Sequence, residues 1–582
     1  MEYHYTSEKN IQCLIYLMKQ HGVKKVIASP GTTNITLVAS LQQDPFFEMY
    51  SAVDERSAAY MACGLAAESG EAVAISCTGA TASRNYIPGL TEAFYRKLPV
   101  LAITSTQHTG RVGQLVPQVI DRSVIQNDIA VMHVDIPSFI TQEDEWAGNV
   151  RINDALLALH HKGGGPVHIN LHTTYSKDFT VKTLPKVRMI RRIETRDVFP
   201  EIKHKTVAIF VGAHGKWTPE LTENVDRFCE RYNAVVICDH TSNYHGKYRV
   251  LFSLITSQKY LHTDLNTMDL LIDIGSVSGA YMKLKPKEVW RVCPDGMIQD
   301  RFKKLTYLFD MEEETFFSHF AEQDEKERGT SYYTECLKQY ESLYREIREM
   351  PFSNLWIAKN TAMRLPEDSI IHFGILNSLR SWNYFEIPSS VTCYSNTGGF
   401  GIDGALSTLM GACLADPNKL HFGVLGDLAF FYDINAIANR NLKNNLRILL
   451  INNGGGQEFR NYNHPAARFG SAADAFIAAA GHYGNKSRAL VKNYAETLGF
   501  EYLSASNKKE FQSNVQRFVT PEITSAPILF EVFTDSLDEN NALLIINETA
   551  PDHPTQAERV KRIAKNILGE KSVLRIKKVM GK

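Results

Sequence analysis

The sequence has almost no net charge and no cysteine pattern, and each absence excludes a class of protein. Its 582 residues include 63 Lys and Arg and 64 Asp and Glu, which gives a formal net charge of -1. This balance provides no electrostatic basis for binding nucleic acid or an anionic membrane surface. The nine cysteines are scattered without a C-x-x-C pair. That argues against both a zinc site and a disulfide framework.

Long apolar runs and a secretion signal are also missing. The N-terminus, Met-Glu-Tyr-His-Tyr, lacks the basic and then apolar segments of a signal peptide. No apolar run approaches the roughly 20 residues that a membrane-spanning helix needs. We therefore predict a cytoplasmic protein. The central part of the chain, residues 206–293, has no G-x-G-x-x-G fingerprint, so neither a dinucleotide nor a flavin site is predicted there.

Strand and helix patterns alternate along the chain. The length suggests three or four domains. Buried strands such as 23–28, 206–211 and 446–451 are followed by turn residues and helical patterns, which is typical of doubly wound parallel sheets. We predict an α/β fold with three such domains. Their expected ranges are 1–180, 190–345 and 350–582, with a basic linker near 175–200, a solvated helical connector over 311–350 and a basic C-terminal tail of no readable function at 577–582.

The most informative stretch runs from Gly426 to Gly456. One buried strand leads into Gly426-Asp427, and the next leads into Asn452-Asn453-Gly454-Gly455-Gly456. Ligands of open α/β sheets bind at the carboxyl ends of strands, so these residues should meet at one edge. The carboxylate of Asp427, the amide oxygen of Asn453 and the carbonyl of Gly455 suit Mg²⁺. The alternative is an ordinary strand–helix–strand unit with an acidic strand end and a glycine turn.

This stretch resembles the diphosphate-binding signature of thiamine diphosphate (ThDP) enzymes, and its surroundings resemble one family, the MenD (SEPHCHC synthase) enzymes. The resemblance implies three domains of the ThDP-dependent decarboxylase type, with ThDP and Mg²⁺ as cofactors. It also implies that a bulky apolar residue, Ile402, supports the cofactor from below. The similar segments are Tyr394-Ser395-Asn396, Gly401-Ile402-Asp403-Gly404, Leu406-Ser407-Thr408, Gly426-Asp427-Leu428 and Tyr432–Ala436. The predicted cofactor-binding residues are Glu55, Ile402, Gly426, Asp427, Leu428, Ala429, Asn453, Gly455 and Gly456.

Glu55 begins a predicted helix at the carboxyl end of a strand, in Asp54-Glu55-Arg56-Ser57. From the residues alone, an acid that complements the helix dipole explains it. In the resemblance, Glu55 matches the family's catalytic glutamate, which hydrogen-bonds the aminopyrimidine of ThDP and promotes ylid formation. The resemblance places ThDP between the first domain of one subunit and the third domain of another. It therefore implies a homodimer or homotetramer.

The chain departs from the family where arginines hold substrate carboxylates. Thr33, Thr397 and the run Ser105–His108 stand where the family has arginine motifs, and Arg380 lies two residues before the corresponding arginine. Other polar groups are available instead. His108 and His464 are candidates for acid–base residues, because histidine titrates near neutral pH. The alternative is that both are ordinary loop residues. The candidate substrate residues are Thr32, Thr33, Gln107, His108, Gln114, Ser378, Arg380, Thr397, Glu458, Arg460 and His464.

These features predict an enzyme that decarboxylates a 2-oxo acid and transfers the resulting ThDP-bound carbanion or enamine to an acceptor. A pyruvate-like donor is expected because few charges remain to hold a longer diacid. Two alternatives stay open. One is a true SEPHCHC synthase of menaquinone biosynthesis that uses 2-oxoglutarate and isochorismate. The other is a ThDP-binding protein without catalysis. Besides further copies of the chain, the expected partners are a small 2-oxo acid and an acceptor, with no nucleic acid and no membrane.

Overall fold

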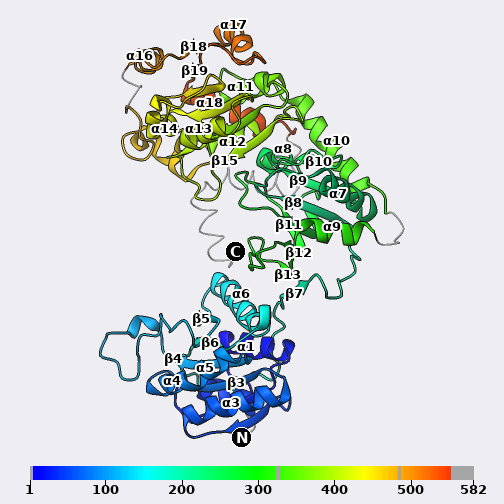
Figure 1. Ribbon diagram of the computed structural model, residues 1–582, viewed down its shortest axis with the longest axis vertical. Helices are drawn as coiled ribbons and strands as arrows, with labels where there is room; N and C mark the ends of the chain where they lie inside the picture. Colours follow the sequence, from blue (N-terminus) through cyan, green and yellow to red (C-terminus); the bar gives the residue numbers. More distant parts are fainter. Residues whose placement is uncertain (1–3, 323–327, 483–486, 552–582) are drawn as a thin grey trace, which may run out of the picture. The chain divides into compact units, whose positions relative to one another are not determined.

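The computed structural model describes residues 4–322, 328–482 and 487–551 (Figure 1). The chain divides into two compact units. The first unit contains the residues up to Phe199 together with Pro294–Asp310. The second contains Pro200–Cys293 and the residues from Met311 onward. Among the described residues, every helix is too short or too polar to cross a lipid bilayer.

The first unit is built on a six-stranded parallel sheet (blue to cyan in Figure 1). Alternate residues of a strand point to opposite faces, so Val73 and Ile75 enter one core and Ala74 enters the other. The strand order is β2 (Glu48–Ser51), β1 (Lys25–Ala28), β3 (Val73–Thr78), β4 (Val100–Thr106), β6 (Val167–His172) and β5 (Met132–Ile136). The helices are α1 (Lys9–Gln20), α2 (Ile35–Gln42), α3 (Glu55–Ser69), α4 (Thr81–Asn85), α5 (Ile87–Tyr95) and α6 (Gln142–Ala158).

The second unit contains a central group of parallel strands and a separate six-stranded parallel sheet. The central strands run in the order β10 (Arg249–Leu251), β9 (Ala234–Cys238), β8 (Val207–Val211), β11 (Thr267–Ile274) and β12 (Lys285–Val292). The last sheet has the order β15 (Thr392–Ser395), β14 (Ile370–Phe373), β16 (His421–Gly426), β17 (Leu446–Asn452), β19 (Ile528–Phe533) and β18 (Glu501–Ala505).

Helices of very different lengths accompany these strands. In the central part they are α7 (Pro219–Tyr232), α8 (Ser253–Ser257), α9 (Glu313–Ala321) and α10 (Ser331–Glu346). Around the last sheet they are α11 (Asn354–Thr361), α12 (Asn377–Trp382), α13 (Ala405–Ala415), α14 (Asp427–Tyr432), α15 (Gln457–Arg460), α16 (Ala489–Thr497), α17 (Lys508–Phe518) and α18 (Ser536–Asn547).

The predicted α/β class with three parallel sheets is confirmed, and the domain boundaries remain a prediction. Two local predictions were wrong. The expected linker contains β7 (Arg191–Glu194), which pairs with β13 (Leu305–Asp310). It was missed because only Ile193 of this short strand is buried. The described part of the connector over 311–350 contains the helices α9 and α10 as expected, but it is not merely solvated, because α9 buries Phe316 and Phe317. The basic tail at 577–582 lies outside the described residues.

A buried arginine fixes the start of β17, the strand that leads to the predicted metal turn. Arg447 has 0% of its surface exposed. Its guanidinium donates to the carbonyl oxygens of Phe518 at 2.6 Å, Thr520 at 3.0 Å and Glu522 at 2.6 Å. These bonds tie the strand to the chain that follows α17.

We expect Arg447→Leu to lower the free energy of unfolding by about 3 kcal/mol or more, because three backbone carbonyl groups would lose a charged donor and the buried carbonyl of Phe518 would be left unpaired. The midpoint of the first thermal transition measures the loss. Arg440→Leu, at an exposed position, is the control. Equal midpoints for the two variants would contradict the prediction.

Candidate active site

The carboxylate of Asp427 lies at the joint between two neighbouring parallel strands. It follows β16, and the pairing of Gly426 with Ile451 brings the turn after β17 beside it. One oxygen, Oδ2, accepts from the backbone N–H groups of Gly454 at 2.8 Å and Gly455 at 3.0 Å. The other, Oδ1, accepts from the N–H of Leu428 at 2.7 Å. The predicted neighbours are thus brought together at one sheet edge.

This arrangement fits a divalent cation. Asp427 is only 3% exposed, and burial raises its pKa to about 6 although the surrounding N–H groups lower it. A nearby cation would offset the cost of keeping this carboxylate charged. The Oδ1 atom of Asn453 is buried and has no hydrogen-bond partner. Since buried polar atoms are normally paired, the chain leaves an oxygen ligand available beside a carboxylate.

The turn needs its glycines. Gly454 has a φ of +87°, in the region that favours glycine. A Cβ on Gly455 would lie 3.0 Å from the carbonyl oxygen of Ala478, and Gly456 donates to the same oxygen. The turn is therefore packed directly against the backbone at Ala478. By contrast, the space around Gly426 is open, as a site for a bulky anion requires.

Neighbouring motif residues have structural partners. The Asp433 side chain accepts from the backbone N–H and the hydroxyl of Ser407, so it holds the start of α13 against the end of α14. Ile402 lies half-buried just before α13. The N–H of Leu428, a predicted cofactor-binding residue, already donates to Asp427.

A buried acid that the sequence analysis missed stands behind the turn. Glu531 in β19 accepts from the Asn452 amide at 2.8 Å and from the Tyr502 hydroxyl at 2.7 Å. Burial raises its pKa, and the nearby charge of Asp427 acts in the same direction. Its signal was an acid inside the apolar run 527–533. Glu531 positions Asn452, the residue before the predicted ligand Asn453.

Glu55 belongs to the first unit. It is the first residue of α3, half-buried, and it accepts a long hydrogen bond of 3.4 Å from the Asn85 amide. Asp54 caps the helix by accepting from the N–H of Ser57. Asp54 thus provides the cap, and Glu55 lies in the first turn, where the helix dipole favours an acid.

The other predicted residues of the first unit are mostly neutral and internally paired. Thr33 is buried, and its hydroxyl donates to the Ser105 carbonyl at 2.8 Å. Gln107 donates to the Tyr175 hydroxyl at 2.9 Å. His108 accepts the Gly110 N–H on Nδ1, so it caps a short 3₁₀ helix. Thr32 and Gln114 are exposed.

An arginine missed by the sequence analysis lies buried in this unit. Arg122 donates to the Gly79 carbonyl and to the Asn170 side chain. The sequence offered no clear signal for it, because Arg122 stands next to Asp121 in a long loop between strands. Both acceptors are neutral oxygens. These bonds therefore attach Arg122 to the loop after β3 without pairing its charge with a carboxylate.

In the second unit the predicted cations are paired. Arg380 donates to Glu458 Oε1 at 2.6 Å, and Arg460 lies 2.7 Å from Asp474. With its amide in the orientation that satisfies both ends, Asn377 donates to Glu458 Oε2 at 3.1 Å. His464 accepts the Ala466 N–H and caps a 3₁₀ helix. Ser378 and Thr397 are buried.

Comparison with known proteins agrees with this geometry. Residues 9–130 match the family described as thiamine pyrophosphate enzyme, N-terminal TPP binding domain. A 2-succinyl-5-enolpyruvyl-6-hydroxy-3-cyclohexene-1-carboxylate synthase from Bacteroides fragilis is 32% identical over 91% of this chain and 97% of its own length. The chain belongs to this family of ThDP-dependent synthases.

Other members show the same extent of similarity. The synthase of the same name from Bacteroides thetaiotaomicron is 31% identical over 91% of this chain and 97% of its own length. That from Phocaeicola vulgatus is 31% identical over 93% and 98%. The predicted resemblance, the enzyme class and the ThDP cofactor are therefore confirmed, whereas the individual residue roles remain predictions.

We expect Asn453→Ala to weaken Mg²⁺-dependent ThDP binding at least tenfold, since it would remove one metal ligand. Its thermal midpoint without cofactor should stay unchanged, because Asn453 Oδ1 has no protein partner to lose. Titration of ThDP at fixed Mg²⁺, followed by tryptophan fluorescence, measures the affinity. Unchanged affinity would exclude Asn453 as a ligand.

Proposed function

We propose that this chain is a Mg²⁺-dependent ThDP enzyme that decarboxylates a small 2-oxo acid and joins the remainder to an acceptor. The observation that carries the proposal is Asp427 bonded to the glycine turn beside an unpaired Asn453 oxygen. Asp427, Asn453 and the Gly455 carbonyl would hold the ion. Bound ThDP supplies the electron sink for loss of CO₂. Glu55 would hold a proton against the aminopyrimidine N1′ atom.

The charges of the candidate substrate residues favour a donor with one carboxylate. A charge-assisted hydrogen bond to a carboxylate contributes about 1.5–3 kcal/mol. In this chain Thr33 is neutral, and Arg380 and Arg460 are already paired with carboxylates. A second carboxylate on the donor would gain little from these residues. A short monoacid such as pyruvate has no second carboxylate, so the pairing of these arginines does not weaken its binding.

A second candidate is the activity named for the relatives, SEPHCHC synthase. The similarity over more than nine-tenths of both chains favours it. It would need 2-oxoglutarate and isochorismate to be held by groups other than paired arginines. Release of CO₂ from 2-oxoglutarate only when isochorismate is added would support this candidate over a pyruvate-like donor.

With ThDP and Mg²⁺ we expect CO₂ release from pyruvate to exceed that from 2-oxoglutarate. Glu55→Gln should lower the rate by about 10²–10⁴-fold, the range for losing a positioned proton-transfer group. ThDP binding by this variant, measured by the same titration, serves as the control. An active Glu55→Gln protein would remove Glu55 from the mechanism, and no CO₂ from any 2-oxo acid would refute decarboxylation.

We further propose that the enzyme is a homo-oligomer whose sites combine Glu55 of one subunit with Asp427 of another. Glu55→Gln and Asp427→Asn proteins should each be inactive. Unfolded and refolded together, they should regain about a quarter of wild-type activity, because half of the dimers would be mixed and one of two symmetric sites in each would be intact. No recovery, with good refolding of wild-type protein, would argue for sites within one chain.

A further inference from the structure

Three apolar residues of the second unit have an unusual backbone conformation. In the described part of this unit, six non-glycine residues have a positive φ, which residues with a side chain rarely adopt. Half of them are Asn or Asp, whose short polar side chains tolerate this conformation. The other half are apolar, namely Leu376 at +65°, Phe400 at +55° and Ala479 at +46°. These three need another explanation.

All three residues belong to segments at the edge where the cofactor site is predicted. Leu376 comes soon after the end of β14, and Phe400 comes soon after the end of β15. These two strands pair with each other, and β14 also pairs with β16, the strand that leads to Asp427. Ala479 adjoins Ala478, against which the predicted metal turn packs. The three unusual conformations therefore occur in three separate segments at the same edge of the last sheet.

Leu376 has dihedral angles that suit glycine. Its φ of +65° and ψ of −124° match the first central residue of a type II′ turn, a position at which glycine is preferred. The surrounding backbone nevertheless fixes these angles. The carbonyl oxygen of Leu376 accepts from the Arg380 N–H at 2.8 Å, and the Gly374 N–H donates to the Val424 carbonyl at 2.8 Å. These hydrogen bonds hold a conformation that the leucine side chain opposes.

The edge that carries Leu376 and Phe400 contains open space. Leu376 is half-buried, and Phe400 is 37% exposed. A Cβ added to Gly398, Gly399 or Gly426 would meet no atom within 4 Å. Glycine would adopt the backbone conformation at positions 376 and 400 without strain. Large apolar side chains thus occur at strained positions near a predicted cofactor site, and backbone strain of this kind is typical of functional sites.

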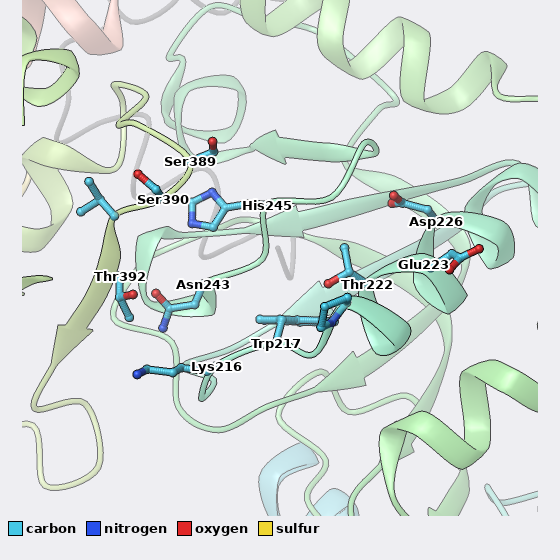
Figure 2. Close-up of a pocket in the computed structure, with 12 residues that line it drawn as sticks. Lys216, Trp217, Thr222, Glu223, Asp226, Asn243, His245, Ser389, Ser390 and Thr392 are labelled. Atoms are coloured by element: carbon cyan, nitrogen blue, oxygen red, sulfur yellow. The ribbon is translucent and has the colours of Figure 1, made fainter. Parts of the chain in front are cut away.

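A cavity elsewhere in the second unit provides a contrast. It has a volume of about 610 Å³ and lies around Trp217, Asn243 and His245 (Figure 2). Asn243 also has a positive φ, of +51°, but its side chain exchanges hydrogen bonds with the backbone of Cys393 at 2.7 and 3.0 Å. These bonds account for the conformation of Asn243, whereas an apolar side chain cannot form them.

We propose that Leu376 and Phe400 are specificity-determining residues, and that their side chains restrict the donor to a 2-oxo acid with a small alkyl substituent. This inference rests on the proposed function, because it names the group that the decarboxylated acid carries. Apolar side chains beside the donor favour a methyl group over a second carboxylate, which would lose its hydration there. They also exclude longer substituents by volume, and one methylene in such a pocket changes binding by about tenfold or more.

The binding test uses the full-length protein with ThDP and Mg²⁺. Its probes are lactate and 2-hydroxypentanoate, which resemble 2-oxo acids but lack the carbonyl group needed for decarboxylation. Ligand-observed NMR measures the Kd of each. The wild type should bind lactate about tenfold more tightly than 2-hydroxypentanoate. Leu376→Ala and Phe400→Ala should each bind 2-hydroxypentanoate about five- to tenfold more tightly than the wild type, because each enlarges the site, and should change the Kd for lactate by less than about twofold.

Leu490 provides the matched control, because it is a partly exposed leucine, 42%, in the ordinary helix α16. Leu490→Ala should leave both Kd values unchanged. Thermal midpoints without cofactor test the strain. Leu376→Gly should unfold at a higher temperature than Leu376→Ala, since only glycine adopts a φ of +65° freely. Leu490→Gly should unfold at a lower temperature than Leu490→Ala, because glycine destabilises a helix. The same order at both positions would overturn the inference.

Three results of the binding test would also overturn it. They are binding of neither acid, equal binding of both by the wild type, and a ratio of Kd values that neither substitution changes. If the ratio changes as expected but no 2-oxo acid yields CO₂, the proposed decarboxylation fails and the size limit stands. If CO₂ is released but the ratio is unchanged, the decarboxylation stands and the size limit fails.

Discussion

The carboxylate of Asp427 couples the register of a sheet to the geometry of the candidate site. It directly follows β16, yet two of its hydrogen bonds go to the turn that follows β17. The two strands must therefore pair as Gly426 with Ile451 for these bonds to form. Arg447 fixes the beginning of β17, while Glu531 holds Asn452 at its end. The position of the predicted metal ligands is thus set by the sheet as well as by the loop.

Much of this could be predicted because the signals are local. The apolar runs of β16 and β17 and the residues at their ends identify both strands and Asp427. The resemblance added the cofactor. Elements with little apolar pattern escaped, as β7 did with its single buried residue. The Arg380–Glu458 pair also escaped, because its partners are 78 residues apart and meet only through packing.

The family relationship and the pocket chemistry constrain different parts of the enzyme. Similarity to the synthases covers nearly the whole chain and fixes the cofactor chemistry. The positions that we predict to face substrates differ in character: Thr33 is neutral, and Arg380 and Arg460 are paired with carboxylates. Membership of the family therefore does not by itself decide the substrate, since function is determined by the site and not by the fold.

The Arg380–Glu458 pair has an evolutionary consequence. Its two members lie on separate short helices, α12 and α15, and the arginine keeps its full charge behind a single acidic partner. Loss of that acid in one mutational step would leave the guanidinium without its carboxylate partner, whereas gain of an acid there would pair it. The charge presented at this position can therefore change by one substitution without rebuilding the sheet that carries the predicted cofactor site.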